Sequence, residues 1–195
     1  MTTGEDLAAQ VRGLLDSLRE PSFASFLGDW PRAARRRAIP ACHLPVLRWL
    51  PDVAAGAAPF SVDVVDELCR EAPKLAWRQS YGAGDFDAQF LGNYGWTEIL
   101  GLHGPLASER IACGFLLLGP ATHYPRHRHE AEEWYLPLSG TAAWQQGEAE
   151  WRERSPGMPI HHASEEPHAM RTGAAPLLAL YLWRSNNLAQ TARLG

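Results

Sequence analysis

The sequence contains few cysteines and no C-x-x-C pair. Its three cysteines are Cys42, Cys69 and Cys113, and an odd number cannot be paired completely within one chain. We therefore expect free thiols in a reducing compartment rather than a disulfide framework. The N-terminal segment has acidic residues and lacks an unbroken apolar core, so it does not have the pattern of a secretory signal. We expect a cytoplasmic protein.

Long apolar runs and a strong charge of either sign are also missing. No stretch approaches the roughly 18 apolar residues of a membrane-spanning helix, and the formal net charge is only -4 at pH 7. We therefore expect neither a membrane nor a nucleic acid as partner. The one basic run, residues 32–38, is interpreted as a solvated helix face. The sequence shows no internal repeat and no low-complexity segment.

The first half of the chain has a helical pattern interrupted by prolines. With 195 residues and 46% hydrophobic content, the chain is expected to form one structural domain with a sizeable core. Apolar residues recur at steps of three and four near the start. We predict helices over residues 4–18, 30–37, 45–55 and 62–70. Residues 1–90 are thus expected to form a helical extension that covers one face or end of a barrel.

The second half of the chain, residues 91–195, has a pattern of short strands separated by glycine-rich turns. We predict strands over residues 94–101, 110–118, 133–138, 141–146, 149–154, 168–172 and 177–184. Many short strands joined by such turns favour a mainly β fold, either a sandwich or a jelly-roll barrel. The interior of such a barrel can enclose a ligand, so the functional site is expected in this half.

Three potential metal ligands follow one another closely in the strand half. His127, His129 and Glu133 have the spacing H-x-H-x3-E, and Tyr135 follows two residues later. If the segment is one strand, all four side chains lie on the same face. The alternative is a polar strand that exposes these side chains to water. Because the start of the segment is polar on both faces, a barrel mouth with a metal site is the preferred interpretation.

A fourth ligand is expected from a strand that returns to the same place. His168 follows Pro167, which restricts the backbone before it and gives the histidine a defined entry into its strand. We predict that His168 completes the set, and that His161 and His162 line the rim or face solvent. Imidazole and carboxylate ligands suit zinc, iron, manganese, nickel or cobalt, and they leave coordination positions open for substrate.

These residues resemble a known family. The pattern H-x-H-x3-E-x6-G, which ends at Gly140, is similar to the first metal motif of the cupin superfamily, and the segment from Gly157 to His168 is similar to the second. Two departures affect turns rather than ligands. Seven residues separate Gly119 from His127 where the family has five, and the sequence SPG of residues 155–157 replaces P-x-G.

Within the cupins, the sequence resembles the Q-type dimethylsulfoniopropionate (DMSP) lyases and their relatives. The similar segments read YPRHRHEAEEWYLPLSG, PHAMRT and PLLALYLWR, and the resemblance covers roughly the last hundred residues. It implies a cupin barrel with one divalent transition metal ion bound by His127, His129, Glu133 and His168. It places Tyr124 and Tyr135 at two active-site tyrosines. A homodimer is compatible with it, because cupin sheets often pair between subunits.

The implied reaction is an elimination from a small sulfonium carboxylate. A metal-bound carboxylate has more acidic α-hydrogens, because the cation stabilises the charge that forms when the proton leaves. Tyr135 is the expected base, and Tyr124 is the expected substrate contact or alternative base. Loss of the α-proton then expels dimethyl sulfide and leaves acrylate. Tyr124 and Trp183 are also expected to bind the sulfonium by cation-π attraction of roughly 0.5 to 2 kcal/mol each.

Two other classes of function remain open at this stage. The first is a cupin enzyme of another reaction type, such as a dioxygenase or an isomerase of a small carboxylate or sugar. The second is a non-catalytic cupin that binds a metal or a small ligand. The presence of both tyrosines beside all four ligands favours the lyase.

Overall fold

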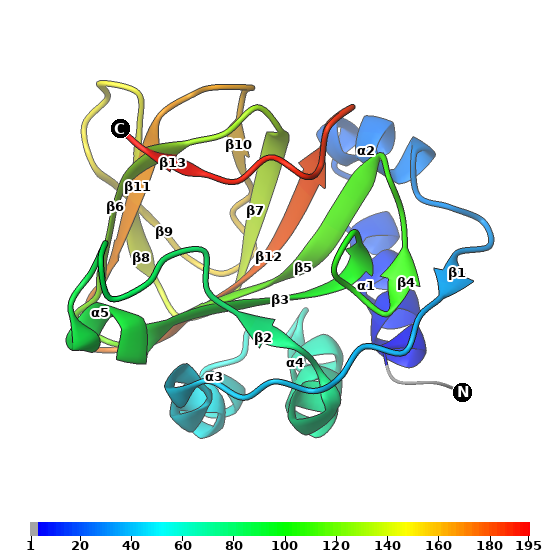
Figure 1. The fold of residues 1–195 in the computed structure, drawn as a ribbon, viewed down its shortest axis with the longest axis horizontal. Coiled ribbons are helices and arrows are strands. Elements are labelled where there is room, and N and C mark those ends of the chain that lie inside the picture. Colours follow the sequence, from blue (N-terminus) through cyan, green and yellow to red (C-terminus); the bar gives the residue numbers. More distant parts are fainter. Residues whose placement is uncertain (1–3) are drawn as a thin grey trace.

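Two β-sheets face each other across the interior of the protein, and helices cover the outer face of one of them (Figure 1). The computed structural model describes residues 4–195. The larger sheet has eight strands in the order β1-β4-β3-β5-β12-β7-β10, with β2 paired to β3 outside that path. The smaller sheet has five strands in the order β13-β6-β11-β8-β9. This is the mainly β architecture that the strand pattern predicted.

The strands are distributed over the two sheets as follows. The larger sheet contains β1 (Arg35–Arg36), β2 (Trp77–Arg78), β3 (Tyr94–Gly101), β4 (Leu106–Ala107), β5 (Ile111–Leu118), β7 (Glu132–Ser139), β10 (Ile160–His162) and β12 (Leu177–Arg184). The smaller sheet contains β6 (His123–Arg128), β8 (Ala142–Gln146), β9 (Arg152–Arg154), β11 (His168–Thr172) and β13 (Arg193–Leu194). The predicted strands over residues 94–101, 168–172 and 177–184 are confirmed.

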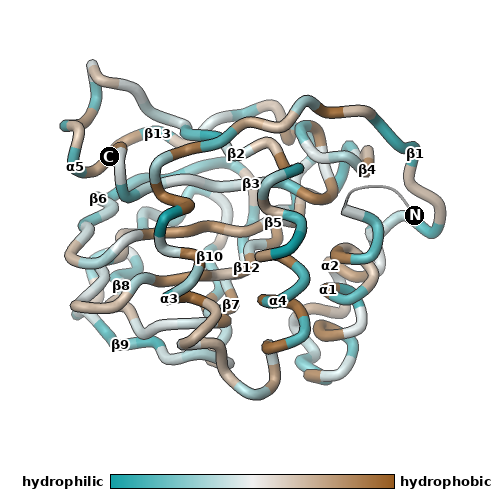
Figure 2. Tube along the Cα trace, turned by 90° about the horizontal axis from the view of Figure 1, so that it is seen from below, coloured by the Kyte–Doolittle hydropathy of each residue, from teal (hydrophilic) through white to brown (hydrophobic). Residues whose placement is uncertain are grey.

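The helices come from the first half of the chain. They are α1 (Glu5–Ser17), α2 (Ala24–Gly28), α3 (Leu50–Ala55), α4 (Val62–Glu71) and α5 (Ala88–Asn93), with short 3-10 helices at Pro21–Phe23, Pro45–Trp49 and Ala72–Lys74. Figure 2 looks onto α3 and α4 from below, with strands of the larger sheet behind them. Within residues 4–195, no helix has the length and apolar character needed to cross a membrane.

Strand β12 shows how the larger sheet serves two cores. Its residues Leu178, Leu180 and Leu182 belong to the apolar cluster formed with α1, α2 and α4 on the outer face. The alternating residues Tyr181 and Trp183 belong to a second cluster, between the sheets. Successive side chains of a strand point to opposite faces, so one strand contributes to both clusters. The inner cluster is the one that borders the functional site.

The predicted helix over residues 30–37 is wrong. The basic run there is extended instead, and β1 pairs with β4 through Arg35 and Arg36. The guanidinium of Arg37 donates to three carbonyl oxygens at the end of β3 and in the loop after it, those of Gly101, Leu102 and Gly104. An extended chain reaches these long-range partners, and they replace the helical hydrogen bonds. The run therefore contributes a two-residue edge strand instead of a solvated helix face.

Candidate metal centre

Three strands and one turn bring the predicted ligands together. His127 lies on β6 and Glu133 on β7, with His129 in the turn between them. His168 begins β11 and pairs in register with His127. The expectation of a single continuous strand is therefore wrong, because the chain crosses from the smaller to the larger sheet at residues 129–131. The side chains still converge, because the inner faces of both sheets meet in the barrel interior.

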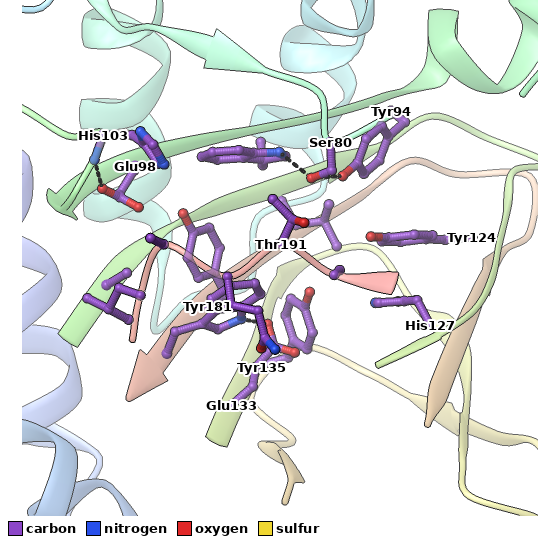
Figure 3. Close-up of a pocket in the computed structure, with 18 residues that line it drawn as sticks. Ser80, Tyr94, Glu98, His103, Tyr124, His127, Glu133, Tyr135, Tyr181 and Thr191 are labelled. Atoms are coloured by element: carbon purple, nitrogen blue, oxygen red, sulfur yellow. Dashed lines mark hydrogen bonds between the residues drawn. The ribbon is translucent and has the colours of Figure 1, made fainter. Parts of the chain in front are cut away.

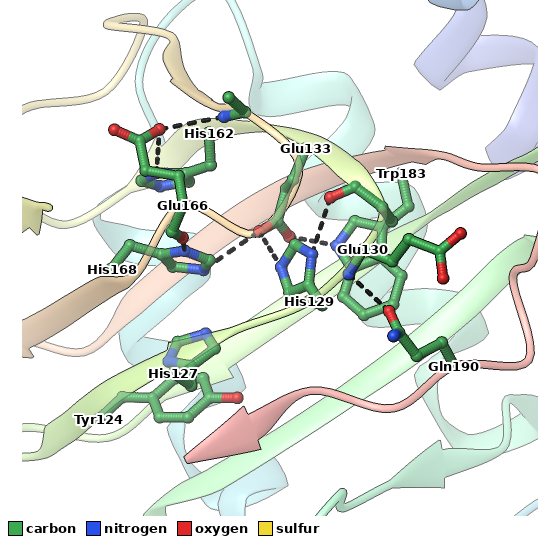
Figure 4. A network of polar contacts seen from close by, with 12 residues as sticks. Tyr124, His127, His129, Glu130, Glu133, His162, Glu166, His168, Trp183 and Gln190 are labelled. Carbon is green, nitrogen blue, oxygen red and sulfur yellow. Dashed lines mark hydrogen bonds and ion pairs between the residues drawn. The ribbon is translucent and has the colours of Figure 1, made fainter. Parts of the chain in front are cut away.

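The carboxylate of Glu133 is the centre of the cluster (Figure 4). Its Oε2 lies 3.0 Å from Nε2 of His129 and 3.3 Å from Nε2 of His168. Ligating atoms of these three buried residues all lie within 4.8 Å of one another. His127 lies beside this group, with its ring centroid 4.2 Å from that of His168 and 6.3 Å from that of His129.

Each of the three histidines has its Nδ1 bound to a backbone carbonyl. The bonds run from His127, His129 and His168 to the oxygens of Pro125 (2.9 Å), Ala131 (2.8 Å) and Glu166 (2.9 Å). A carbonyl oxygen can only accept, so Nδ1 donates and the neutral ring presents a lone pair at Nε2. Such backbone bonds orient metal-binding histidines in many proteins.

This arrangement suits a cation between the ligands. In the neutral tautomers, Nε2 of His129 and of His168 would face the Glu133 carboxylate with lone pairs only, and the buried Nε2 of His168 has no hydrogen-bond partner. Burial raises the pKa of Glu133, but His129 and His168 outweigh it and hold that pKa well below its usual range. Burial lowers the pKa of His127 well below its usual range. The donor set thus fits a divalent metal ion.

Trp183 contacts this cluster directly. Its Nε1 donates to Oε1 of Glu133 at 2.5 Å, and its ring centroid lies 4.3 Å from that of His129. The indole therefore fixes the orientation of the carboxylate. The sequence suggested Trp183 only as a substrate contact, and the structure places it at both the cluster and the pocket.

A pocket of about 100 Å³ adjoins the cluster between the sheets (Figure 3). Both predicted tyrosines line it. The ring of Tyr124 stacks on His127 with 4.0 Å between centroids, and its hydroxyl lies 3.2 Å from that of Tyr81. Burial raises the pKa of Tyr135 well above its usual value, and the charge of Glu133 raises it further. A cation bound to Glu133 would offset that second cause.

The histidines expected at the rim behave differently from each other. His161 is half-exposed and bonds the surface carboxylate of Glu132 at 2.9 Å. His162 is fully buried and stacks on His168 with 3.9 Å between ring centroids. The expectation for His162 is wrong because β10 pairs with β7 and places His162 opposite Glu133. Alternation then turns His161 outward and His162 inward.

Several lining residues were not selected from the sequence. They are Ser80, Tyr94, Trp96, Glu98, His103, Ala112, Leu116, Tyr181 and residues 188–192 of the C-terminal segment. The lining residues on β3 are two positions apart in the sequence, as Tyr181 and Trp183 are on β12, so those of each strand share a face. The C-terminal segment gave no such signal, because its position depends on β13 pairing with β6.

Comparison with known proteins places this geometry in a family. Residues 28–179 match the model of the dimethylsulfoniopropionate lyase family. A DMSP lyase of Ruegeria pomeroyi, DddQ, is 28% identical over 185 residues, which cover 93% of this chain and 89% of that protein.

Solved structures agree with that match. The crystal structure of DddQ from Ruegeria pomeroyi has a TM-score of 0.89 and 26% identity, and the match covers 98% of this chain and 95% of that one. One of the solved DMSP lyases RdDddP and RnDddQII has a TM-score of 0.86 and 30% identity, with 98% and 99% covered. A cupin-2 domain from Rhodospirillum rubrum shares the fold at 14% identity and a TM-score of 0.50, with 63% of this chain and 76% of that one covered. The predicted cupin barrel with its N-terminal helices is confirmed.

Proposed function

Because the chain belongs to the dimethylsulfoniopropionate lyase family, we propose that it is a carbon-sulfur lyase that cleaves DMSP to dimethyl sulfide and acrylate. One observation carries the proposal. Three imidazoles and a carboxylate meet beside a small pocket that is lined by two buried tyrosines. The pocket size suits a small molecule, and the aromatic walls suit a cationic group.

We assign the metal to His127, His129, Glu133 and His168. A divalent transition metal ion, namely zinc, iron, manganese, nickel or cobalt, would polarise the substrate carboxylate and stabilise the negative charge that develops when the α-proton leaves. The backbone bonds at the three Nδ1 atoms keep the imidazoles oriented. Trp183 holds the remaining carboxylate oxygen of Glu133.

Tyr135 is the proposed general base. It lies on the same face of β7 as Glu133, and its side chain lines the pocket. Tyr124 is already bonded to Tyr81 through its hydroxyl and stacked on His127 through its ring. We therefore assign Tyr124 to substrate positioning and Tyr135 to proton removal.

The electrons of the reaction balance without an oxidant or a reductant. Tyr135 takes the α-proton, and the electron pair of that C–H bond becomes the new carbon-carbon double bond. The bond from the β-carbon to sulfur breaks at the same time, and its electron pair leaves with sulfur. The products are dimethyl sulfide and acrylate, with one proton left on the enzyme.

The test is to incubate the purified protein, loaded separately with each metal, with DMSP and to measure dimethyl sulfide by gas chromatography. Tyr135→Phe should keep the metal content and lower turnover by about 100-fold, the scale for loss of a general base. Tyr124→Phe is the matched variant, because it removes the other hydroxyl from the same pocket. Its main effect should be on KM.

Two outcomes would contradict the proposal. If no loaded form releases dimethyl sulfide, the protein is not a DMSP lyase, and oxygen consumption would point to a dioxygenase instead. If Tyr135→Phe retains turnover while Tyr124→Phe loses it, the base is Tyr124.

A further inference from the structure

Two carboxylates line the pocket. Its lining residues, all in the described part of the chain, include Glu133 and Glu98 but neither lysine nor arginine. Burial lowers the pKa of His103 from its usual value. Glu133 belongs to the metal centre. Glu98 is a second acid in a cavity with mostly aromatic and apolar walls.

Glu98 lies away from the metal centre on the same sheet. In Figure 3, Glu98 and His103 are at the end of the pocket opposite Tyr124 and His127. The strand register gives the same separation, because Glu98 pairs with Gly114, Gly114 with Tyr181, and Tyr181 with Tyr135. Two strands, β5 and β12, therefore lie between Glu98 on β3 and the proposed base on β7, and Tyr181 is on the second of them.

Small residues allow side chains to pack closely around Glu98. A Cβ added to Gly114 would lie 2.7 Å from the hydroxyl oxygen of Tyr181, so this side chain leans over the bare backbone of Gly114. A Cβ added to Gly101 would lie 2.5 Å from Oε1 of Glu98 and 2.9 Å from Cβ of Ala112. The carboxylate therefore lies beside the methyl group of Ala112, which pairs in register with Trp183.

The two oxygens of the Glu98 carboxylate have different surroundings. Oε1 accepts hydrogen bonds from the backbone N–H groups of His103 and Gly104 and so holds the loop after β3. Oε2 accepts none from residues 4–195, and no arginine or lysine of this range lies within ion-pair distance of Glu98. The nearby guanidinium of Arg37 is bonded to carbonyl oxygens of that loop.

An uncompensated carboxylate in this position is unfavourable unless a cation joins it. Burial raises the pKa of Glu98 to about 7, although the two loop amides, Arg37 and Arg78 oppose that rise. Holding the loop needs only one neutral acceptor, which a glutamine would supply. The second oxygen and the negative charge remain to be explained. Glu98 lines this pocket and also a second cavity, whose lining includes Arg37 and Lys74.

We propose that Glu98, together with the walls formed by Trp96, Tyr181 and Trp183, is the subsite for the cationic group of the substrate. The pocket then has two poles, with the metal centre for the carboxylate and Glu98 for the sulfonium. This inference rests on the proposed function, because it takes a sulfonium carboxylate as the substrate. It makes Glu98 a determinant of specificity for zwitterions over neutral carboxylates of the same shape.

The experiment compares two ligands that differ in one charge. DMSP has a sulfonium, and 4-methylpentanoate has a CH group in the same place with the same two methyl branches. Dissociation constants are measured by calorimetry on metal-loaded Tyr135→Phe protein, in which DMSP persists, with and without Glu98→Gln. The glutamine keeps an oxygen for the two loop amides. In the protein that retains Glu98, DMSP should bind more tightly than 4-methylpentanoate.

With Glu98→Gln, the affinity for DMSP should fall by roughly tenfold or more, as expected for loss of one partner of a buried charge pair. The affinity for 4-methylpentanoate should change by less than about twofold, because no charge faces Glu98 in that complex. Glu132→Gln is the matched control, since it makes the same change at the surface, where Glu132 bonds Arg184 and His161. It should leave both affinities unchanged.

Three results would overturn the inference. The first is equal weakening of both ligands by Glu98→Gln, which would limit Glu98 to holding the loop. The second is no effect on either ligand. The third is equal affinity of the protein that retains Glu98 for DMSP and for 4-methylpentanoate. The lyase assay is separate: a protein that prefers the cation through Glu98 but releases no dimethyl sulfide would refute the proposed function and leave this subsite in place.

Discussion

The two faces of the larger sheet differ in how completely their side chains are satisfied. On the outer face, Leu178, Leu180 and Leu182 pack against helices in a cluster of apolar side chains. On the inner face, buried polar atoms lack hydrogen-bond partners, as the two ring nitrogens of His162 on β10 do, and charged groups such as Glu98 face a cavity. Apolar packing stabilises the fold, whereas incompletely paired polar groups are available to ligands. One strand can thus contribute to stability through the residues that point to the outer face and to ligand binding through the residues that point to the inner face.

The largest effect should come from removing a ligand of the metal centre that adjoins the inner face. His129→Ala deletes a ring that lies 3.0 Å from Glu133, so bound metal and lyase activity should be lost together. Metal content by elemental analysis and dimethyl sulfide release are measured on the same sample. Glu132→Ala is the control, because its neighbour Glu133 is fully buried while Glu132 bonds surface partners. Equal losses in both variants would show that the two faces are not separate.

Truncation of a large apolar side chain on the outer face should lower the stability and leave the activity unchanged. Leu180 is 1% exposed and lies in the cluster under the helices. Leu180→Ala should lower the free energy of unfolding by about 2 to 5 kcal/mol, because it removes buried methyl groups and leaves a cavity. Turnover per folded molecule should stay near the original value. Urea unfolding gives the first quantity, and the lyase assay at low temperature gives the second. A large fall in turnover would mean that the outer core sets the geometry of the site.

The sequence was informative where side-chain type and spacing identify a role directly. His127, His129, Glu133 and His168 are imidazoles and a carboxylate at metal-site spacing, and the structure brings them together. That result did not depend on the assumed single strand, which is wrong. Residues that point inward from either sheet meet in the same interior, so an error about the strand boundary did not move the ligands apart.

The sequence was less informative where long-range pairing decides. The spacing of Tyr94, Trp96 and Glu98 indicates a shared face of β3, but only the pairing with β5 shows that this face lines the pocket. Likewise, the burial of His162 follows from the pairing of β10 with β7. The basic run at Arg35 was misjudged for the same reason, because its hydrogen bonds go to distant residues.

The smallest of these effects concerns Glu98 and the pH dependence of stability. The carboxyl has an ordinary pKa of 4.5, and burial raises its pKa to about 7 in the folded protein. Between these values the folded state keeps a proton that the unfolded state has released, so stability should fall as pH rises from 4.5 through 7. The loss attributable to this group should be about 2 to 3 kcal/mol at pH 8.

Glu98→Gln cannot titrate, so its free energy of unfolding should fall less than that of the original protein between pH 5 and pH 8. Urea unfolding at a series of pH values measures the difference, in which groups common to both proteins cancel. Parallel curves would show that the pocket carboxylate is as well solvated as one at the surface, and the contrast between the two faces would then rest on the metal centre alone.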